Sequence, residues 1–191
     1  GTKALRIAQD RLLEKQFLVD QQLPHATFEI VTTPAELIPA VKKVGFPCIL
    51  KTTRGGYDGK GQVILRSAMD MEVAQQLLTA SVCVLEAMVH FDQEISVIIS
   101  QNSAGQQAVF PAIENQHRDN ILHISICPAR ISAALAAQAE SVAAKIATQI
   151  ELVGTLGVEF FVGHDGQLYV NEIAPRPHNS GHYTIEGTNI S

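Results

Sequence analysis

The amino-acid sequence predicts an α+β fold of two lobes joined by a short hinge near residue 87. Helical and strand patterns alternate before that point, and strand patterns predominate after it. A hydrophobic content of 46% in 191 residues supplies a core of ordinary size. Because a cleft between two lobes is a common ligand site, we expect a ligand to bind there.

The first lobe is predicted from capping residues and apolar spacing. Thr33 and Pro34 mark the start of a helix that Gly45 ends. Apolar positions at helical spacing, or short apolar runs between turn residues, mark the other elements. We expect helices over residues 7–20, 34–44 and 69–80, and strands over 27–31, 47–52, 62–66 and 82–86.

The second lobe reads mainly as strands. They are predicted over residues 93–100, 106–110, 121–127, 157–162 and 167–173. One long helix, from Ser132 to Ile150, carries an apolar stripe that includes Leu135, Val142 and Ile146, so it is expected to pack against the sheet.

Composition argues against nucleic acid and membranes as partners. The formal net charge is −5, and Lys and Arg are dispersed. The longest apolar runs are far shorter than the roughly 20 residues of a membrane span. The first residues lack the apolar core of a secretion signal, so a cytoplasmic location is expected. Cys48, Cys83 and Cys127 show no metal-ligand spacing and are predicted to be buried free thiols.

An acidic hairpin is the first candidate site. Asp165-Gly166 is a strong two-residue turn signal, and that turn would set Glu159 opposite Glu172, on the face shared with Phe161 and Val170. Facing carboxylates repel unless a cation neutralises them. Mg²⁺ suits this pair, since it often takes one or two protein carboxylates beside substrate phosphates. Pairing with lysines and a proton shared between the carboxylates are the alternatives.

A glycine-rich loop is the second candidate. Four glycines and three cations lie between Lys51 and Gly61. Glycines let backbone N–H groups approach an anion, and Lys51 and Lys60 add positive charge. The loop lacks the following helix of a P-loop. We interpret it as a mobile lid over a triphosphate, with an ordinary hairpin loop as the alternative.

The hinge and the residues after the acidic strand complete the candidates. The backbone of residues 87–89 could form hydrogen bonds with the edge of an adenine, with Met88 against the ring. Glu94 could accept hydrogen bonds from ribose hydroxyls. Arg176, His178, Asn179 and His182 would suit an oxyanion or phosphate. A surface glutamate and a polar connecting loop are the respective alternatives.

Two segments, residues 54–62 and 171–182, resemble signatures of the ATP-grasp ligases, and in particular of the 5-(carboxyamino)imidazole ribonucleotide synthetases of purine biosynthesis. The resemblance covers essentially the whole chain and implies the ATP-grasp fold. It implies Mg²⁺ ligation by Glu159 and Glu172. It also implies ATP or cofactor contacts at Arg11, Lys51, Gly56, Tyr57, Asp58, Gly59, Lys60, Gly61, Gln62, Glu86, Ala87, Met88, Val89, Glu94, His117, Asn171 and Glu172.

The same resemblance implies a reaction. ATP and bicarbonate would form carboxyphosphate, and the amine of aminoimidazole ribonucleotide would capture the carboxyl group. Arg176, His178 and Asn179 would hold bicarbonate or phosphate, and Tyr57 and Asp58 would meet the ribonucleotide. Rival readings are a formate-dependent glycinamide ribonucleotide transformylase and an ATP-binding module without chemistry.

Family members also have an N-terminal nucleotide-fold domain and a further C-terminal portion, and they are typically homodimers. The resemblance therefore divides this chain into a leading helix and connector (1–24), a small lid lobe (25–86) and a large lobe with the metal site (87–191). By itself the chain is expected to bind ATP and to show little complete synthetase activity.

Overall fold

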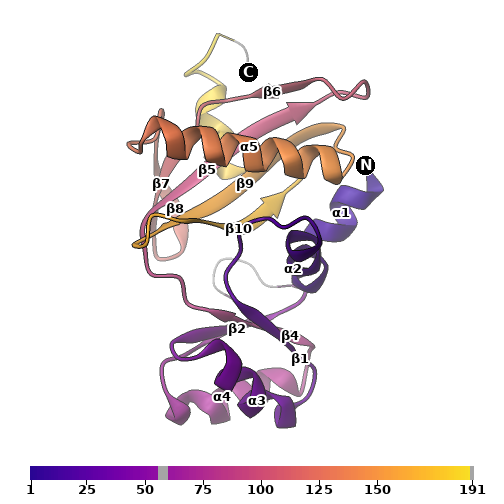
Figure 1. Ribbon diagram of the computed structural model, residues 1–191, viewed down its shortest axis with the longest axis vertical. Helices are drawn as coiled ribbons and strands as arrows, with labels where there is room; N and C mark the ends of the chain where they lie inside the picture. Colours follow the sequence, from indigo (N-terminus) through magenta and orange to yellow (C-terminus); the bar gives the residue numbers. More distant parts are fainter. Residues whose placement is uncertain (56–59, 190–191) are drawn as a thin grey trace.

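The computed structural model describes residues 1–55 and 60–189, which form two antiparallel β-sheets with separate hydrophobic cores (Figure 1). The predicted α+β class is confirmed. The helices are α1 (Thr2–Ala8), α2 (Arg11–Asp20), α3 (Pro34–Val44), α4 (Met71–Leu78) and α5 (Ala133–Gln149), with 3-10 turns η1 (Ala68–Asp70) and η2 (Asn179–Thr184). The strands are β1 (Phe28–Val31), β2 (Cys48–Thr52), β3 (Gln62–Leu65), β4 (Cys83–Ala87), β5 (Phe91–Gln101), β6 (Gln107–Val109), β7 (Ile113–Arg118), β8 (Ile121–Ile126), β9 (Gly154–Gly163) and β10 (Leu168–Ala174).

The smaller sheet has the strand order β1-β4-β2-β3, and α3 and α4 lie together on one side of it (Figure 1). Alternation along β2 buries Cys48 and Leu50 against these helices. The intervening side chains, Ile49 and Lys51, point to the opposite face and line a cleft. The small sheet therefore offers one face to its core and the other to a ligand site.

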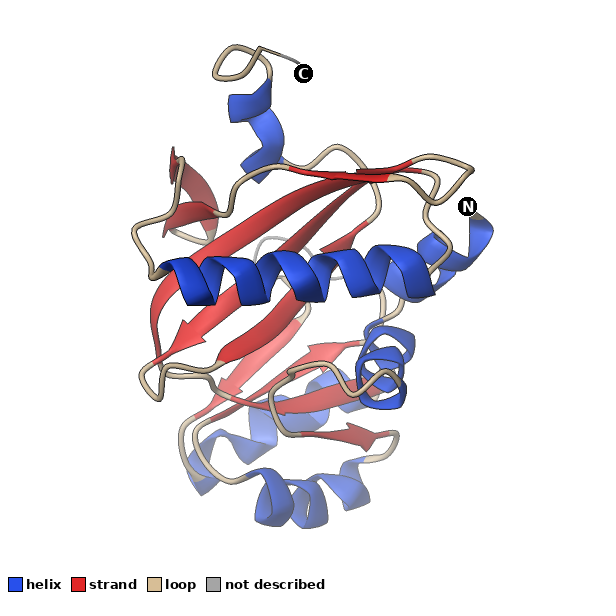
Figure 2. Ribbon diagram, turned by 45° about the horizontal axis from the view of Figure 1, so that its top comes forward, coloured by secondary structure: helices blue, strands red, loops and turns tan. Residues whose placement is uncertain are grey.

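The larger sheet has the order β10-β9-β5-β7-β8, with β6 paired to β5. Helix α5 runs across one face of it (Figure 2). Ala139, Ala143 and Ala147 are fully buried on this helix, and small side chains let its backbone approach the sheet closely. Phe17 and Leu18 of α2 belong to the same core, so the leading helices are anchored to the large sheet.

The predicted single helix over residues 7–20 is wrong, because two helices occupy this region. Asp10 has an extended backbone and its side chain accepts hydrogen bonds from the N–H groups of Leu12 and Leu13. That is the geometry of an N-cap, which begins a new helix at Arg11. The new helix buries two charged side chains, Glu14 and Lys15.

Two other expectations need correction. Strand β7 was not predicted, because Ile113 is its only apolar residue, although its first half is buried. Cys127 is exposed, whereas Cys48 and Cys83 are buried as expected. Cys127 follows β8, an edge strand whose side chains are mostly exposed, so the sheet does not cover it.

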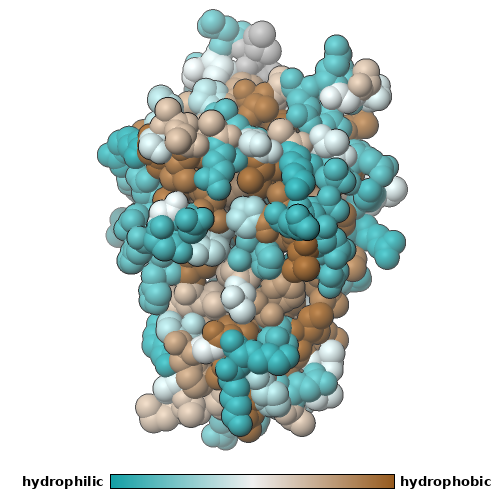
Figure 3. Space-filling view, in the orientation of Figure 1, coloured by the Kyte–Doolittle hydropathy of each residue, from teal (hydrophilic) through white to brown (hydrophobic). Residues whose placement is uncertain are grey.

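Hydrophilic residues are spread over the visible face of both halves, with smaller hydrophobic areas between them (Figure 3). Within residues 1–55 and 60–189, none of the helices combines the length and the apolar character that crossing a membrane requires.

Candidate functional site

A cleft of about 590 Å³ lies between the two sheets, a volume in the range of small-molecule sites. It brings together residues that are far apart in the sequence and that were singled out from sequence alone. The predicted residues that line it are Arg11, Lys51, Lys60, Gln62, Glu86, Ala87, Met88, Val89, Glu94, His117, Glu159, Asn171, Glu172, Arg176, His178 and Asn179.

The glycine-rich loop is only partly represented. Gly56, Tyr57, Asp58 and Gly59 lie outside the described residues, so the contacts predicted for them stay predictions. Gly61 is described but does not line the cleft; its carbonyl accepts a hydrogen bond of 2.9 Å from the N–H of Thr52.

The small-sheet wall of the cleft is cationic. Lys51 on β2 and Glu86 on β4 share the face toward the cleft, because Glu86 pairs with Ile49, two residues before Lys51. Lys51 Nζ lies 3.4 Å from Glu86 Oε1, and Lys15 Nζ of α2 lies 2.9 Å from Glu86 Oε2. Arg11 begins α2 at the edge of the same wall. Three cations therefore surround one carboxylate.

This arrangement shifts two pKa values. Burial disfavours the charged form of Glu86, but the positive charges of Lys15, Lys51 and Arg11 outweigh it and lower the pKa of Glu86 to about 2. Burial lowers the pKa of Lys51, and its neighbours Lys15 and Arg11 lower it further, while Glu86 opposes the shift. Both side chains are thus held in a strongly charged and largely desolvated cluster.

The large-sheet wall is acidic. Glu172 lies directly opposite Glu159 in the β9–β10 hairpin, which confirms the predicted pairing. Burial, and then the charge of Glu172, raise the pKa of Glu159 to about 7. The side chains that reach Glu159 within the described structure are Asn171, whose Nδ2 donates at 3.4 Å, and His178, whose Nε2 lies 3.6 Å away.

The hairpin reaches this pairing by a different route from the one predicted. Gly166 N–H donates to Gly163 O at 2.8 Å and Gly163 N–H donates to Gln167 O at 2.9 Å, so the loop holds three residues, 164–166, instead of two. This moves the register by one residue, so Val170 pairs with Phe160 and is buried in the core, not on the face of Glu159. A register shift between Val170 and Glu172, typical of a β-bulge, then restores Glu172 to its position opposite Glu159.

A histidine and a glutamate complete the polar lining between the walls. His117 Nδ1 forms a short ion pair with Glu94 Oε2. That hydrogen bond, against a smaller effect of burial, raises the pKa of His117. The backbone brings the two together through the β5–β7 pairing, where Glu94 faces Asn115.

The segment that follows β10 in the sequence brings His178 and Arg176 close to the two carboxylates. His178 Nδ1 is 2.9 Å from the hydroxyl of the buried Ser180. Burial lowers the pKa of His178. Its ring packs against Gly157, where an added Cβ would lie 3.0 Å from His178 Cβ. Arg176 Nη2 is 3.8 Å from Glu172 Oε1, so this segment places one cation and a histidine ring beside the carboxylates.

The apolar lining was only partly predicted. The rings of Phe91 and Phe161 stack with centroids 4.5 Å apart and lie at the cleft with Ile49 and Ile64. Strand alternation did place Phe161 on the face of Glu159, and the same rule could have placed Ile49 beside Lys51. The pairing of β5 with β9, which brings Phe91 to Phe161, carries no local signal.

Sequence reasoning also missed two buried charges on α2. Glu14 is 4% exposed and Lys15 2% exposed. Glu14 Oε2 accepts a hydrogen bond of 3.1 Å from the N–H of Ile173, and burial raises the pKa of Glu14 to about 7. A helical wheel could have shown both on the face of Arg11, but it could not show that this face is buried.

The donor set fits a hard divalent cation that also binds a ligand. Glu159 and Glu172 offer carboxylate oxygens on facing positions, and the raised pKa of Glu159 reflects its burial and then the like charge of Glu172. Among the described residues, His, Cys, Asp and Glu side chains nowhere gather in groups of three or more that could hold a metal. Two carboxylates suffice for Mg²⁺ when phosphates and water supply the remaining ligands.

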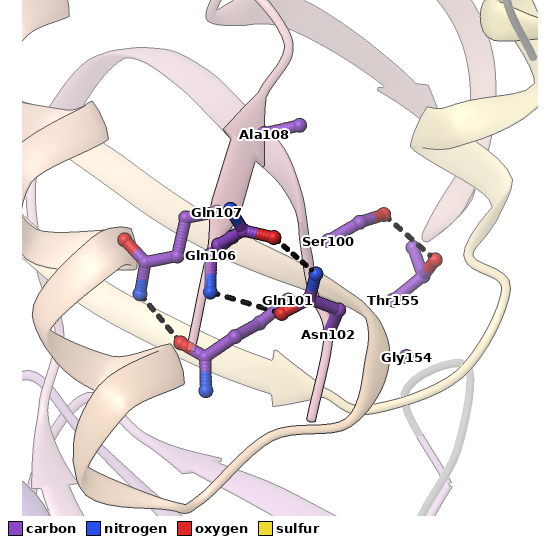
Figure 4. Close-up of a pocket in the computed structure, with 8 residues that line it drawn as sticks. All are labelled: Ser100, Gln101, Asn102, Gln106, Gln107, Ala108, Gly154 and Thr155. Carbon is purple, nitrogen blue, oxygen red and sulfur yellow. Dashed lines mark hydrogen bonds between the residues drawn. The ribbon is translucent and has the colours of Figure 1, made fainter. Parts of the chain in front are cut away.

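A second hollow, of about 360 Å³, lies at the ends of β5 and β9 beside β6 (Figure 4). Its lining amides bond to one another: Gln107 Nε2 to Gln101 Oε1 at 2.6 Å, and Asn102 Nδ2 to Gln106 Oε1 at 2.8 Å. None of the described residues that line it is charged. Its polar groups are therefore satisfied internally, and we assign it no ligand.

Comparisons with known proteins agree with this geometry. A family model described as the ATP-grasp domain matches residues 16–191. The N5-carboxyaminoimidazole ribonucleotide synthase of Bacillus subtilis (strain 168) is 45% identical over 186 residues, which cover 97% of this chain and 49% of that protein.

Solved structures give the same result. A crystal structure of an N5-carboxyaminoimidazole ribonucleotide synthetase in complex with ADP superimposes with a TM-score of 0.92 at 48% identity, covering 97% of this chain and 49% of that one. The ADP complex of the Staphylococcus aureus enzyme gives a TM-score of 0.92 at 42% identity with the same coverage. The chain thus spans about half the length of the curated relatives it matches.

Proposed function

Because the chain belongs to the ATP-grasp family, we propose that its cleft binds Mg²⁺-ATP and uses it to phosphorylate bicarbonate. The carboxyphosphate formed would carboxylate 5-aminoimidazole ribonucleotide and give 5-(carboxyamino)imidazole ribonucleotide, ADP and phosphate, a step of de novo purine biosynthesis. The observation that carries the proposal is the pair of oppositely charged walls in one cleft. Mg²⁺-ATP carries the complementary charges, since its phosphates would meet the cationic wall and its metal the acidic wall.

The small-sheet wall would bind the nucleotide. Adenine would meet the backbone of residues 87–89, with Met88 against its ring and Glu94 at the ribose. Lys51 and Arg11 would contact the phosphates, joined by Lys60 and Gln62 from the end of the glycine-rich loop. Preorganised cations lower the barrier to phosphoryl transfer because they offset charge on the transferring group without further reorganisation.

The large-sheet wall would hold the metal. Glu159 and Glu172 are the proposed Mg²⁺ ligands, with Asn171 supporting Glu159 through its side-chain amide. When bound, Mg²⁺ would supply charge neutralisation at the phosphates.

The segment after β10 would hold the second substrate. Bicarbonate is a poor electrophile, and phosphorylation gives it a leaving group. Arg176 would pair with its negative charge, and His178 and Asn179 would donate hydrogen bonds to its oxygens. Tyr57 and Asp58 are proposed to meet the ribonucleotide, on the strength of their place in the loop signature.

Three broader proposals follow from the same family. The boundaries at residues 24/25 and 86/87 would divide the chain into connector, lid lobe and large lobe. The complete protein would be a homodimer, which sedimentation at the mass of one subunit would contradict. It would act in the cytoplasm on small molecules, which recovery in a membrane fraction would contradict.

A chimera tests the reaction. These 191 residues would replace the matching segment of the Bacillus subtilis relative, and ADP release would be measured with ATP, bicarbonate and aminoimidazole ribonucleotide. We expect release that depends on all three, and loss of release with Glu172→Gln but not with the exposed control Glu72→Gln. Release with formate and glycinamide ribonucleotide instead would contradict the proposed substrates.

A further inference from the structure

Helix α2 presents a charged face to the interior of the protein. Arg11, Glu14 and Lys15 are spaced by three and four residues, so they lie on one face of the helix. Glu14 and Lys15 are almost completely buried. Burying a charge is costly unless it is paired, so a helix face of this kind must meet specific partners.

Lys15 meets Glu86 from behind the cleft. Lys15 Nζ lies 2.9 Å from Glu86 Oε2, and both side chains are almost fully buried, with exposures of 2% and 6%. Lys15 itself does not belong to the cleft lining, whereas Glu86 and Lys51 do. Lys15 therefore acts on the site only through Glu86.

The other oxygen of Glu86 faces Lys51. Glu86 Oε1 is 3.4 Å from Lys51 Nζ, and within the described residues it accepts no hydrogen bond of good geometry. The contact is loose for an ion pair, since charge-assisted hydrogen bonds are usually about 2.7–2.9 Å long. The carboxylate is thus tightly held by Lys15 and only loosely by Lys51.

The charge balance depends on Lys15. Arg11, Lys15 and Lys51 surround Glu86, and Lys15 and Arg11 also interact with Glu14. Three cations therefore meet two carboxylates, and the cluster keeps a formal excess of positive charge. Without Lys15, Glu86 would have Lys51 as its nearest cation and would draw it into a close pair. The ammonium that faces the cleft would then be neutralised and directed away from a ligand.

We propose that Lys15 is a positioning residue for the nucleotide: it occupies Glu86 so that Lys51 stays free to bind phosphate. The inference deepens the proposed function and rests on it for the identity of the ligand. Its structural part, the competition of two lysines for one carboxylate, can be tested without any nucleotide.

The first test is the titration of the Lys51 ammonium, followed by NMR in the 191-residue chain without nucleotide. Lys15→Met removes the competing cation but keeps most of the side-chain volume. We expect the titration of Lys51 to move to higher pH, because Glu86 then pairs with it alone and one repelling charge is gone. Lys43→Met is the matched control, since Lys43 forms a surface pair with Glu29 at 3.0 Å and should leave the titration unchanged.

The second test compares a non-hydrolysable ATP analogue with adenosine by calorimetry. Lys15→Met should lower the affinity for the analogue by about 10-fold and leave the affinity for adenosine unchanged, because only the analogue carries phosphates. Adding Glu86→Gln to Lys15→Met should recover part of the lost preference for the analogue over adenosine, since an uncharged amide then replaces the carboxylate that captures Lys51. A general loss of structure would weaken both ligands and would not be rescued.

The outcomes separate the two proposals. An unmoved Lys51 titration together with unchanged analogue affinity would overturn the role of Lys15 while the proposed function stands. A wild-type chain that binds no analogue would count against the proposed function, and the Lys51 titration would still decide the inference. If Lys15→Met does not fold, the variant Lys15→Met/Glu86→Gln removes both buried charges and should titrate Lys51 as a lysine without a carboxylate partner.

Discussion

Glu86, which is buried, and Glu159, which is half-buried, face the same cleft from opposite sheets, and their surroundings differ in sign. Glu86 is enclosed by Lys15, Lys51 and Arg11, which lower its pKa to about 2 despite burial. Glu159 lies opposite Glu172, and its pKa rises to about 7. One carboxylate is compensated by the protein and the other is not. The difference supports the proposal that Glu159 and Glu172, rather than Glu86, take a cation from solution.

The largest expected effect comes from removing the uncompensated wall. In the double variant Glu159→Gln and Glu172→Gln, we expect the Mg²⁺-dependent part of nucleotide affinity to disappear, a loss of about 100-fold or more. Calorimetry with and without Mg²⁺ measures it. Glu72→Gln, on the exposed start of α4, should change nothing. Retained metal dependence in the double variant would show that the metal binds elsewhere.

The two glutamates should also give opposite dependences of stability on pH. A raised folded-state pKa means that the folded chain binds the proton more tightly, so the contribution of Glu159 is full below pH 4.5 and is lost as pH rises through about 7. The loss is on the order of 3 kcal/mol in the free energy of unfolding of the metal-free chain. The contribution of Glu86 is present above pH 4.5 and is lost as pH falls toward 2.

Denaturant unfolding at several pH values checks this contrast. Relative to wild type, Glu159→Gln should gain stability between pH 5 and pH 7.5, whereas Glu86→Gln should lose it between pH 2.5 and pH 5. Parallel curves for the two variants would contradict the opposite charge surroundings. Added Mg²⁺ should reduce the gain of Glu159→Gln, because the metal stabilises the ionised carboxylate of the wild type.

Removing the cleft-facing cation should have a smaller effect of a different kind. Lys51→Met should lower the affinity for an ATP analogue by about 30-fold. This corresponds to about 2 kcal/mol, as expected for the loss of a charged hydrogen bond. The loss should occur with and without Mg²⁺, because Lys51 lies on the wall opposite the proposed metal ligands Glu159 and Glu172. A loss that appears only with Mg²⁺ would assign Lys51 to the metal side instead. Lys43→Met serves as the control.

The smallest expected effect concerns the packing behind Glu159. Gly157→Ala would place a Cβ 3.0 Å from His178 Cβ and 3.3 Å from His178 Cγ, so the histidine must move by a few tenths of an ångström. We expect a destabilisation of about 1 kcal/mol and a change in analogue affinity of less than about threefold. Gly181→Ala is the matched control, since its nearest contact would be an ordinary 3.5 Å to Ile98. Equal melting temperatures for the two variants would contradict this packing.

Local signals were enough to predict much of the architecture. The cap at Thr33 and the stop at Gly45 bound α3 as predicted, and Ser132 caps α5 through the N–H of Leu135. The facing glutamates were also predicted correctly, although two errors cancelled. The loop holds three residues where two were expected, and the bulge after Val170 compensates for the resulting shift in register. A bulge depends on how a strand meets its neighbours, so no hairpin rule could place it.

The parts that sequence did not predict depend on tertiary contacts. Glu14 and Lys15 look like exposed helix residues until α2 is packed between the sheets. Their partners, Ile173 and Glu86, are distant in sequence. The helix break at Asp10 is a local feature, but a capping aspartate and an ordinary helical aspartate look alike until the chain direction changes.

The most direct test of the proposed site is a calorimetric titration of the wild-type chain with a non-hydrolysable ATP analogue, in Mg²⁺ and in chelator at pH 7.5. We expect one nucleotide to bind per chain in Mg²⁺ and binding to be clearly weaker in chelator, because without the metal the acidic wall would repel a triphosphate. Equal affinity in the two conditions, or no binding by a folded chain, would contradict it.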